Sequence, residues 1–163
     1  MNVTEKAEKR DLLFVFLKKS VEKCYADDFT LIRRDMERAS VARIFVYMNE
    51  FLNSEEDFKS LLKYDLDSEY NRYMSQPKYI SSRRNGALPD VILHRREDKP
   101  YKDNLLIAEF KAHGKEPKDD FKKIENFISE PKYEYFLGIF VELNHSGAKY
   151  WYLQNGEDWK ELN

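Results

Sequence analysis

The sequence contains one cysteine, Cys24, and three histidines, and it has no long apolar run. A single cysteine excludes an internal disulfide, so a reducing, cytoplasmic location is expected. These few cysteines and histidines form no zinc-ligand pattern. The chain also lacks a glycine-rich phosphate loop and a G-x-S-x-G nucleophile motif. The longest apolar run covers residues 12–17, far too short to cross a bilayer, so no membrane partner is expected.

The composition is that of a folded domain. Of the 163 residues, 42% are hydrophobic and 36% are charged, which excludes a disordered chain and predicts one domain over residues 1–163. The net charge of −2 counts mildly against a protein that coats nucleic acid. Phosphate binding depends on local patches, however, so a small nucleic-acid site is not excluded.

Hydrophobic periodicity predicts helices first and strands afterwards. The helices are expected at about residues 5–26, 33–52 and 54–62, followed by strands at 66–73, 90–94 and 105–112. A helix at about 118–129 and strands at 135–143 and 148–153 complete the chain. This order predicts an α/β fold in which helices flank a mixed β-sheet.

Charged residues interrupt the apolar strand at 105–112. Glu109 and Lys111 lie two residues apart, so both side chains leave the same face of the strand. Asp90 begins the preceding strand and would lie close to Glu109 if the two strands form a hairpin. Two close carboxylates raise one pKa unless a cation lies between them, and oxygen ligands of this kind suit Mg²⁺. The alternative is a solvent-facing Glu109–Lys111 ion pair on an edge strand.

Pro89-Asp90, then Glu109-Phe110-Lys111 on an apolar strand followed by an amphipathic helix, resembles the PD-(D/E)XK nuclease superfamily. The resemblance covers roughly residues 34–143. It implies a restriction-endonuclease-like core of helix, three strands, helix and strand, here with an extra N-terminal helix. It also implies one or two Mg²⁺ (or Mn²⁺) ions held by Asp90, Glu109 and the main-chain carbonyl of Phe110, with Lys111 as a catalytic residue.

Members of this superfamily often carry another acidic residue on the first core helix, and Glu37 is the match here. Glu37 shares a helical stripe with Val41, Ile44 and Met48, so it is expected to join the catalytic and metal-binding residues. The alternative is a first-turn glutamate that the helix dipole favours.

The segment of residues 67–72 resembles a second, looser signature. In an uncharacterised subgroup of the superfamily, an acidic-Tyr-Asn-Arg strand precedes Pro-Asp and a His-Arg pair. Glu69, Arg72, His94 and Arg95 are the matching residues, and they are candidates for binding the substrate. An ion pair within the sheet is an equally good interpretation, and a lone histidine is more often a structural residue than a ligand.

The resemblance favours a Mg²⁺-dependent nuclease that acts on DNA through a metal-activated water. No appended recognition domain is visible, so a homodimer or a targeting partner protein would account for specificity. The first alternative is a catalytically inactive module of the same fold that binds nucleic acid or a protein partner. The second is an α/β interaction protein in which Glu109 and Lys111 form a surface pair.

Overall fold

A computed structural model of the chain describes residues 2–69, 88–96 and 104–162. Its contacts group the chain into two compact units, Met1–Lys63 and Tyr64–Asn163. The single domain expected over residues 1–163 stays a prediction.

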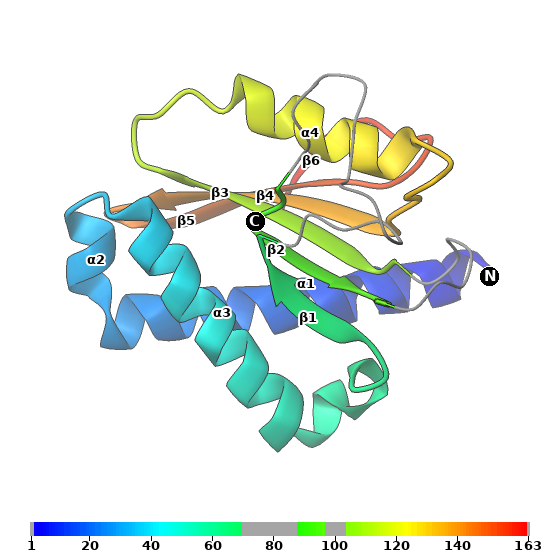
Figure 1. The fold of residues 1–163 in the computed structure, drawn as a ribbon, viewed down its shortest axis with the longest axis horizontal. Coiled ribbons are helices and arrows are strands. Elements are labelled where there is room, and N and C mark those ends of the chain that lie inside the picture. Colours follow the sequence, from blue (N-terminus) through cyan, green and yellow to red (C-terminus); the bar gives the residue numbers. More distant parts are fainter. Residues whose placement is uncertain (1, 70–87, 97–103, 163) are drawn as a thin grey trace. The chain divides into compact units, whose positions relative to one another are not determined.

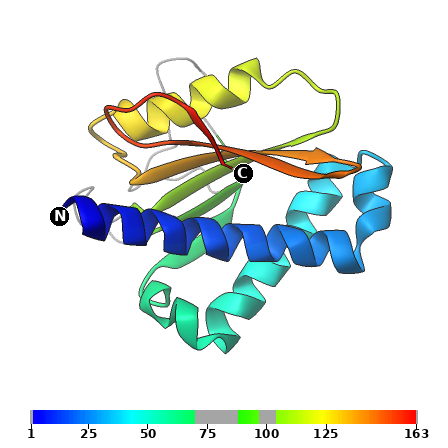
Figure 2. The same cartoon turned by 180° about the vertical axis from the view of Figure 1, so that it is seen from behind.

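The first unit is helical. It consists of α1 (Val3–Asp27), α2 (Phe29–Arg33), α3 (Glu37–Ser54) and a 3₁₀ helix, η1 (Glu56–Leu61). Figure 2 shows α1 as one uninterrupted helix. It begins with a capping box, in which Asn2 and Glu5 each accept a hydrogen bond from the other's backbone N–H. Among the described residues, no helix is both long and apolar enough to cross a membrane.

The predicted helices agree with this unit in part: the short helix α2 was not predicted, and the helix expected at 54–62 is the 3₁₀ helix η1, which begins at Glu56. The helix expected at residues 5–26 is confirmed as α1, and its apolar residues at helical spacing are buried: Leu13, Phe16, Leu17, Val21 and Cys24. The second helix was expected from residue 33, but the chain ends α2 at Arg33 and begins α3 at Glu37. Asp35 lies between them with a φ of 52°, a left-handed conformation that interrupts a helix.

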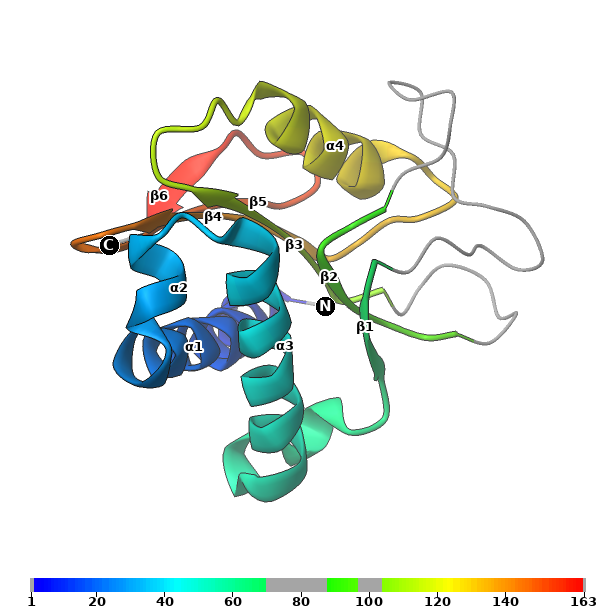
Figure 3. The same cartoon turned by 60° about the vertical axis from the view of Figure 1, so that its left-hand side comes forward.

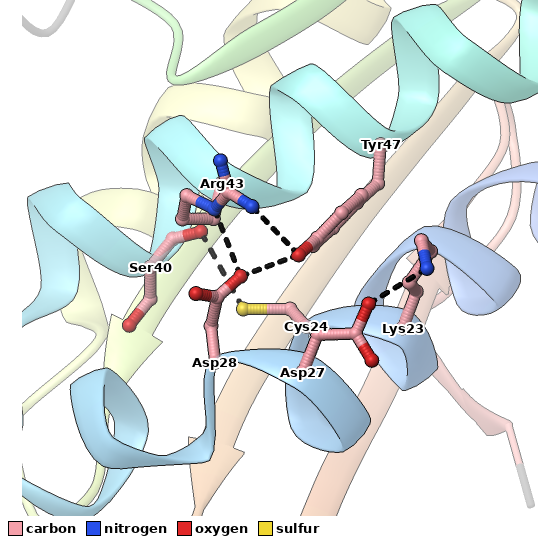
Figure 4. Close-up of polar contacts among 7 residues, drawn as sticks. All are labelled: Lys23, Cys24, Asp27, Asp28, Ser40, Arg43 and Tyr47. Atoms are coloured by element: carbon pink, nitrogen blue, oxygen red, sulfur yellow. Dashed lines mark hydrogen bonds and ion pairs between the residues drawn. The ribbon is translucent and has the colours of Figure 1, made fainter.

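A polar network joins the end of α1 to α3 (Figure 4). The Asp28 Oδ2 atom accepts hydrogen bonds from Arg43 Nε at 2.8 Å and from the Tyr47 hydroxyl at 2.5 Å. Arg43 also donates to the Tyr47 hydroxyl oxygen at 2.8 Å. The hydrogen bonds from Tyr47 and then Arg43 lower the pKa of Asp28. The α1–α2 junction is therefore tied to the middle of α3.

Removing the Tyr47 hydroxyl tests how much this network stabilises the first unit. Tyr47 is buried, so Tyr47→Phe should lower the free energy of unfolding by about 1–2 kcal/mol, because a charged acceptor loses its donor. Urea denaturation followed by circular dichroism measures the change. The same substitution should cost less in an Asp28→Ala background, where the hydroxyl keeps only its hydrogen bond from Arg43; an undiminished cost there would show that the bond to Asp28 contributes nothing.

The second unit holds a sheet of six described strands and one helix. The strands are β1 (Asp65–Ser68), β2 (Val91–His94), β3 (Leu106–Ala112), β4 (Leu137–Asn144), β5 (Gly147–Leu153) and β6 (Lys160–Leu162), with α4 (Lys118–Ser129) between β3 and β4. They lie in sequence order, and among them the β3–β4 pair is parallel and the other four are antiparallel. The expected α/β arrangement with a mixed sheet is confirmed. The short strand β6 was not predicted.

Helix α4 packs closely against one face of this sheet, as Figures 1 and 3 show. Ile92 of β2 and Ile107 of β3 share a buried cluster with Ile124 and Phe127 of α4. The approach depends on Gly138 in β4, because a Cβ atom there would lie 2.2 Å from the Ile124 Cγ2 atom. Gly138 thus allows α4 to lie near enough for its polar residues to reach β3.

A methyl group at position 138 should push α4 away from the sheet. Gly138→Ala is expected to destabilise the protein by about 1–3 kcal/mol through overpacking. Thermal or urea unfolding measures this loss. In an Ile124→Ala background the clashing methyl group is absent, so adding Gly138→Ala there should cost much less. Equal costs in both backgrounds would contradict the proposed contact.

Candidate functional site

Strands β2 and β3 bring two carboxylates together at one end of their pairing. Val91 pairs with Ala108, and continuing this antiparallel register by one residue sets Asp90 opposite Glu109. Both residues lie on the face of the sheet that packs against α4, since Ile92 and Ile107, two residues away, contact that helix. The expected pairing of these two strands is therefore confirmed.

Asp90 is held by the main chain of β3. Its Oδ2 atom accepts a hydrogen bond from the backbone N–H of Phe110 at 2.9 Å. The N–H and C=O groups of one strand residue point to the same side. The Phe110 carbonyl, a predicted metal ligand, therefore points to the side of β3 on which Asp90 lies.

Glu109 is almost completely buried, with 1% of its surface exposed. Its Oε2 atom lies 2.5 Å from Lys123 Nζ, whereas Oε1 is buried with no hydrogen-bond partner among the described residues. Burial and then the nearby charge of Asp90 raise the pKa of Glu109 to about 8, against the opposing effect of Lys123. The alternative of a solvent-facing Glu109–Lys111 ion pair on an edge strand is therefore wrong. Glu109 is buried, and β3 is an inner strand of the sheet.

Lys123 of α4 is a member of this site that sequence reasoning missed. It is 4% exposed, and its ammonium group also donates to the backbone carbonyl of Leu88 at 3.1 Å. The signal that would have found it is helical spacing. Lys123 is four residues before the buried Phe127 and three after the buried Asp120, so both polar residues share the inward stripe of α4.

Lys111 leaves β3 on the same face as Glu109 but is partly exposed. Its Nζ atom lies 2.9 Å from Asp120 Oδ2 on α4. Asp120 also contributes to the raised pKa of Glu109. The predicted trio of Asp90, Glu109 and Lys111 therefore lies at one end of β2 and β3, with two charged residues of α4 added to it.

The donor atoms suit a hard divalent cation. Mg²⁺ is commonly held by one or two carboxylates, with waters and substrate phosphate oxygens completing its shell. Asp90, the Phe110 carbonyl, and Glu109, whose Oε1 atom has no hydrogen-bond partner among the described residues, supply donors of this type. No cluster of three or more histidine, cysteine, aspartate or glutamate side chains arranged to hold a metal ion occurs in the described part of the chain. Any ion here would thus rely on water or substrate ligands.

Three further residues were predicted for this site: Glu37, Glu69 and Arg72. Glu37 opens α3 and belongs to the first unit, whereas Asp90 and Glu109 belong to the second. Its role as a third carboxylate stays a prediction. Glu69 is exposed, and its backbone N–H donates to the Pro89 carbonyl at 3.0 Å, directly before Asp90. Arg72 lies outside the described residues.

His94 and Arg95 lie at the other end of β2. His94 is buried and its Nε2 atom lies 2.9 Å from Asp67 Oδ2, which also accepts a hydrogen bond from Arg96 Nε at 2.8 Å. The Arg95 guanidinium lies over the Tyr64 ring, 5.5 Å from its centre. His94 lies four positions beyond Asp90, a distance of roughly 13 Å along a strand. The structure thus places His94 in an ion-pair cluster within the sheet, away from the two carboxylates.

Comparison with known proteins leaves the origin of this site open. No protein-family model matches the chain, and no curated protein matches it either. Membership of the PD-(D/E)XK superfamily therefore stays a prediction that rests on the sequence motifs.

The raised pKa of Glu109 predicts how stability depends on pH. In the unfolded chain Glu109 loses its proton near pH 4.5, whereas in the folded, metal-free protein it keeps the proton until about pH 8. Between these two pH values the folded state binds one proton more than the unfolded state. The free energy of unfolding therefore falls as pH rises from about 4.5 to 8. Glu109→Gln, which cannot ionise, should lose this part of the dependence.

Urea denaturation at a series of pH values in EDTA measures the effect. Glu161→Gln, at an exposed position of β6, is the matched control and should keep the wild-type slope. If Glu109→Gln and wild type lose stability in parallel across this range, the carboxylate is not the group responsible.

Proposed function

We propose that this protein is a Mg²⁺-dependent phosphodiesterase that hydrolyses nucleic acid, with DNA as the favoured substrate. The observation that carries the proposal is the pair formed by Asp90 and the buried Glu109, whose Oε1 atom has no hydrogen-bond partner among the described residues. Burying a carboxylate with one oxygen unsatisfied is costly. A divalent cation bound between the two carboxylates would offset that cost.

Each residue of the cluster has a distinct task in this proposal. Asp90 and Glu109 hold the ion, together with the Phe110 carbonyl, and the Phe110 N–H fixes the orientation of Asp90. Glu37 is the proposed third carboxylate. A bound Mg²⁺ or Mn²⁺ ion would polarise the phosphodiester and lower the pKa of its bound water.

Lys111 is the proposed catalytic lysine. Asp120 holds its ammonium group at 2.9 Å, on the same face of β3 as Glu109. From there the ammonium orients the attacking water and stabilises the negative charge that develops on the phosphate. Asp120 thus acts as a positioning residue for Lys111.

Substitution of the two central residues tests the proposal. Asp90→Asn and Lys111→Ala should each reduce Mg²⁺-dependent cleavage at least about 100-fold, because the first weakens binding of the ion and the second removes the ammonium that stabilises the developing negative charge. Plasmid, single-stranded DNA and RNA are incubated with the protein and Mg²⁺ or Mn²⁺, and the products are separated on gels. Circular dichroism checks that the variants remain folded.

The matched controls lie on α4, where Asp119 and Lys122 are exposed. Asp119→Asn and Lys122→Ala change the same charges as the test variants and should leave cleavage at the wild-type rate. Full activity in Asp90→Asn or Lys111→Ala would remove these residues from the catalytic site.

A second function, an inactive module that binds nucleic acid or a protein partner, is favoured by one specific observation. Both lysines of the cluster have a carboxylate partner: Lys123 binds Glu109 and Lys111 binds Asp120. Such ion pairs would also form in a site retained only for structure. The same experiment separates the two functions, since an inactive module would bind a nucleic acid or a partner in EDTA and would cleave no substrate with either metal.

A further inference from the structure

Two of the three histidines of the sequence come together where β3 and β4 end. His113 directly follows β3, and His145 lies in the two-residue turn between β4 and β5. Their ring centres are 5.2 Å apart and the ring planes are inclined by 48°. Both residues are exposed to solvent. Two imidazoles from different segments thus share one solvent-facing position.

A buried amide orients the first of these rings. The Nδ1 atom of His113 lies 2.5 Å from Oδ1 of Asn144, a β4 residue that is 7% exposed. An amide oxygen only accepts hydrogen bonds, so Nδ1 carries the proton of the neutral ring. The Nε2 atom therefore keeps its lone pair. Metal-binding histidines are typically held in this way, with one ring nitrogen donating to a fixed oxygen and the other left for the metal.

The spacing of the rings agrees with a shared ion. Two imidazoles bound tetrahedrally to one Zn²⁺, each through an N–Zn bond of about 2.0–2.1 Å, have ring centres on the order of 5 Å apart. The observed 5.2 Å matches this value. The distance between the ring centres therefore permits one shared ion.

We propose that His113 and His145 form a binding site for a transition-metal ion, with Zn²⁺ as the favoured ion and water in its remaining positions. Imidazole ligands select Zn²⁺, Ni²⁺ or Cu²⁺, whereas carboxylates select Mg²⁺ and Mn²⁺. His113 lies four residues beyond Glu109, roughly 13 Å along a strand, so one ion cannot bind both groups. This site is independent of the proposed phosphodiesterase centre.

The three histidines allow a direct test by NMR of the imidazole nitrogens. Zinc chloride is added to the whole protein in buffer with excess Mg²⁺. The His113 and His145 signals should shift together and saturate at one equivalent of Zn²⁺, while the signals of His94, buried beside Asp67, should not move. Before zinc is added, His113 should show the tautomer with its proton on Nδ1.

Substitutions identify the ligands. His113→Ala and His145→Ala should each weaken zinc binding on the order of tenfold or more, and Asn144→Ala should weaken it less, by releasing the His113 ring. Asp90→Asn should keep the zinc-induced shifts of both histidines, which separates this site from the carboxylate pair whether or not the protein cleaves nucleic acid.

Three results would overturn the proposal. The first is the absence of any zinc-induced shift, which would mean that the rings make only an aromatic contact. The second is an equal shift of all three histidine signals. The third is zinc binding that survives both histidine substitutions and is lost in Asp90→Asn.

Discussion

The buried carboxylate of Glu109 is the constraint on which the second unit depends. An ionised group inside an apolar sheet needs a partner of opposite charge, and Lys123 supplies it from α4. That contact requires α4 to lie close to β3 and β4. Ile124 follows Lys123 in α4. Its Cγ2 methyl group packs against Gly138, in the space that a Cβ atom at position 138 would fill. The ion pair and the glycine in β4 are two parts of one close packing.

Stability alone does not explain such a pair. A buried ion pair is often no more stable than apolar residues of the same volume, because desolvation offsets the attraction. Around Glu109 the arrangement is less favourable still, because burial, and then the negative charges of Asp90 and Asp120, raise the pKa of Glu109 to about 8. Near neutral pH, Glu109 in the metal-free site is therefore partly protonated, and its ionised form is the one that pairs with Lys123. A cation that binds there has to displace this proton, so its affinity should increase with pH.

The sequence predicted the parts of the fold that depend on strong local patterns. The bounds of α4 and the pairing of β2 with β3 followed from a clear amphipathic stripe and two apolar runs. The break at Asp35 could not be predicted, because its left-handed conformation involves neither glycine nor proline. Strand β6 is short and exposed, so it has no hydrophobic alternation to detect.

The candidate site was predictable only along the strands. The face shared by Glu109 and Lys111 follows from strand periodicity, but their partners Lys123 and Asp120 lie on a helix whose rotation is set by tertiary packing. The same limit applies at His94. The sequence motif grouped His94 with Arg95. In the structure, the register of β1 and β2 brings Asp67 next to His94, and Arg96 is the arginine that binds Asp67.

On the face of β3 that carries Glu109 and Lys111, side chains become more exposed toward the end of the strand. This difference in exposure distinguishes the two proposed ion sites. Glu109 is 1% exposed, the Lys111 side chain is 19% exposed, and His113 is open to solvent. At the buried end, desolvation makes a carboxylate depend on a cation. At the exposed end, water can complete the shell of an ion held by two imidazoles. The end of β3 thus presents hard oxygen donors and, about four residues further on, an imidazole donor, and imidazole suits Zn²⁺ rather than Mg²⁺.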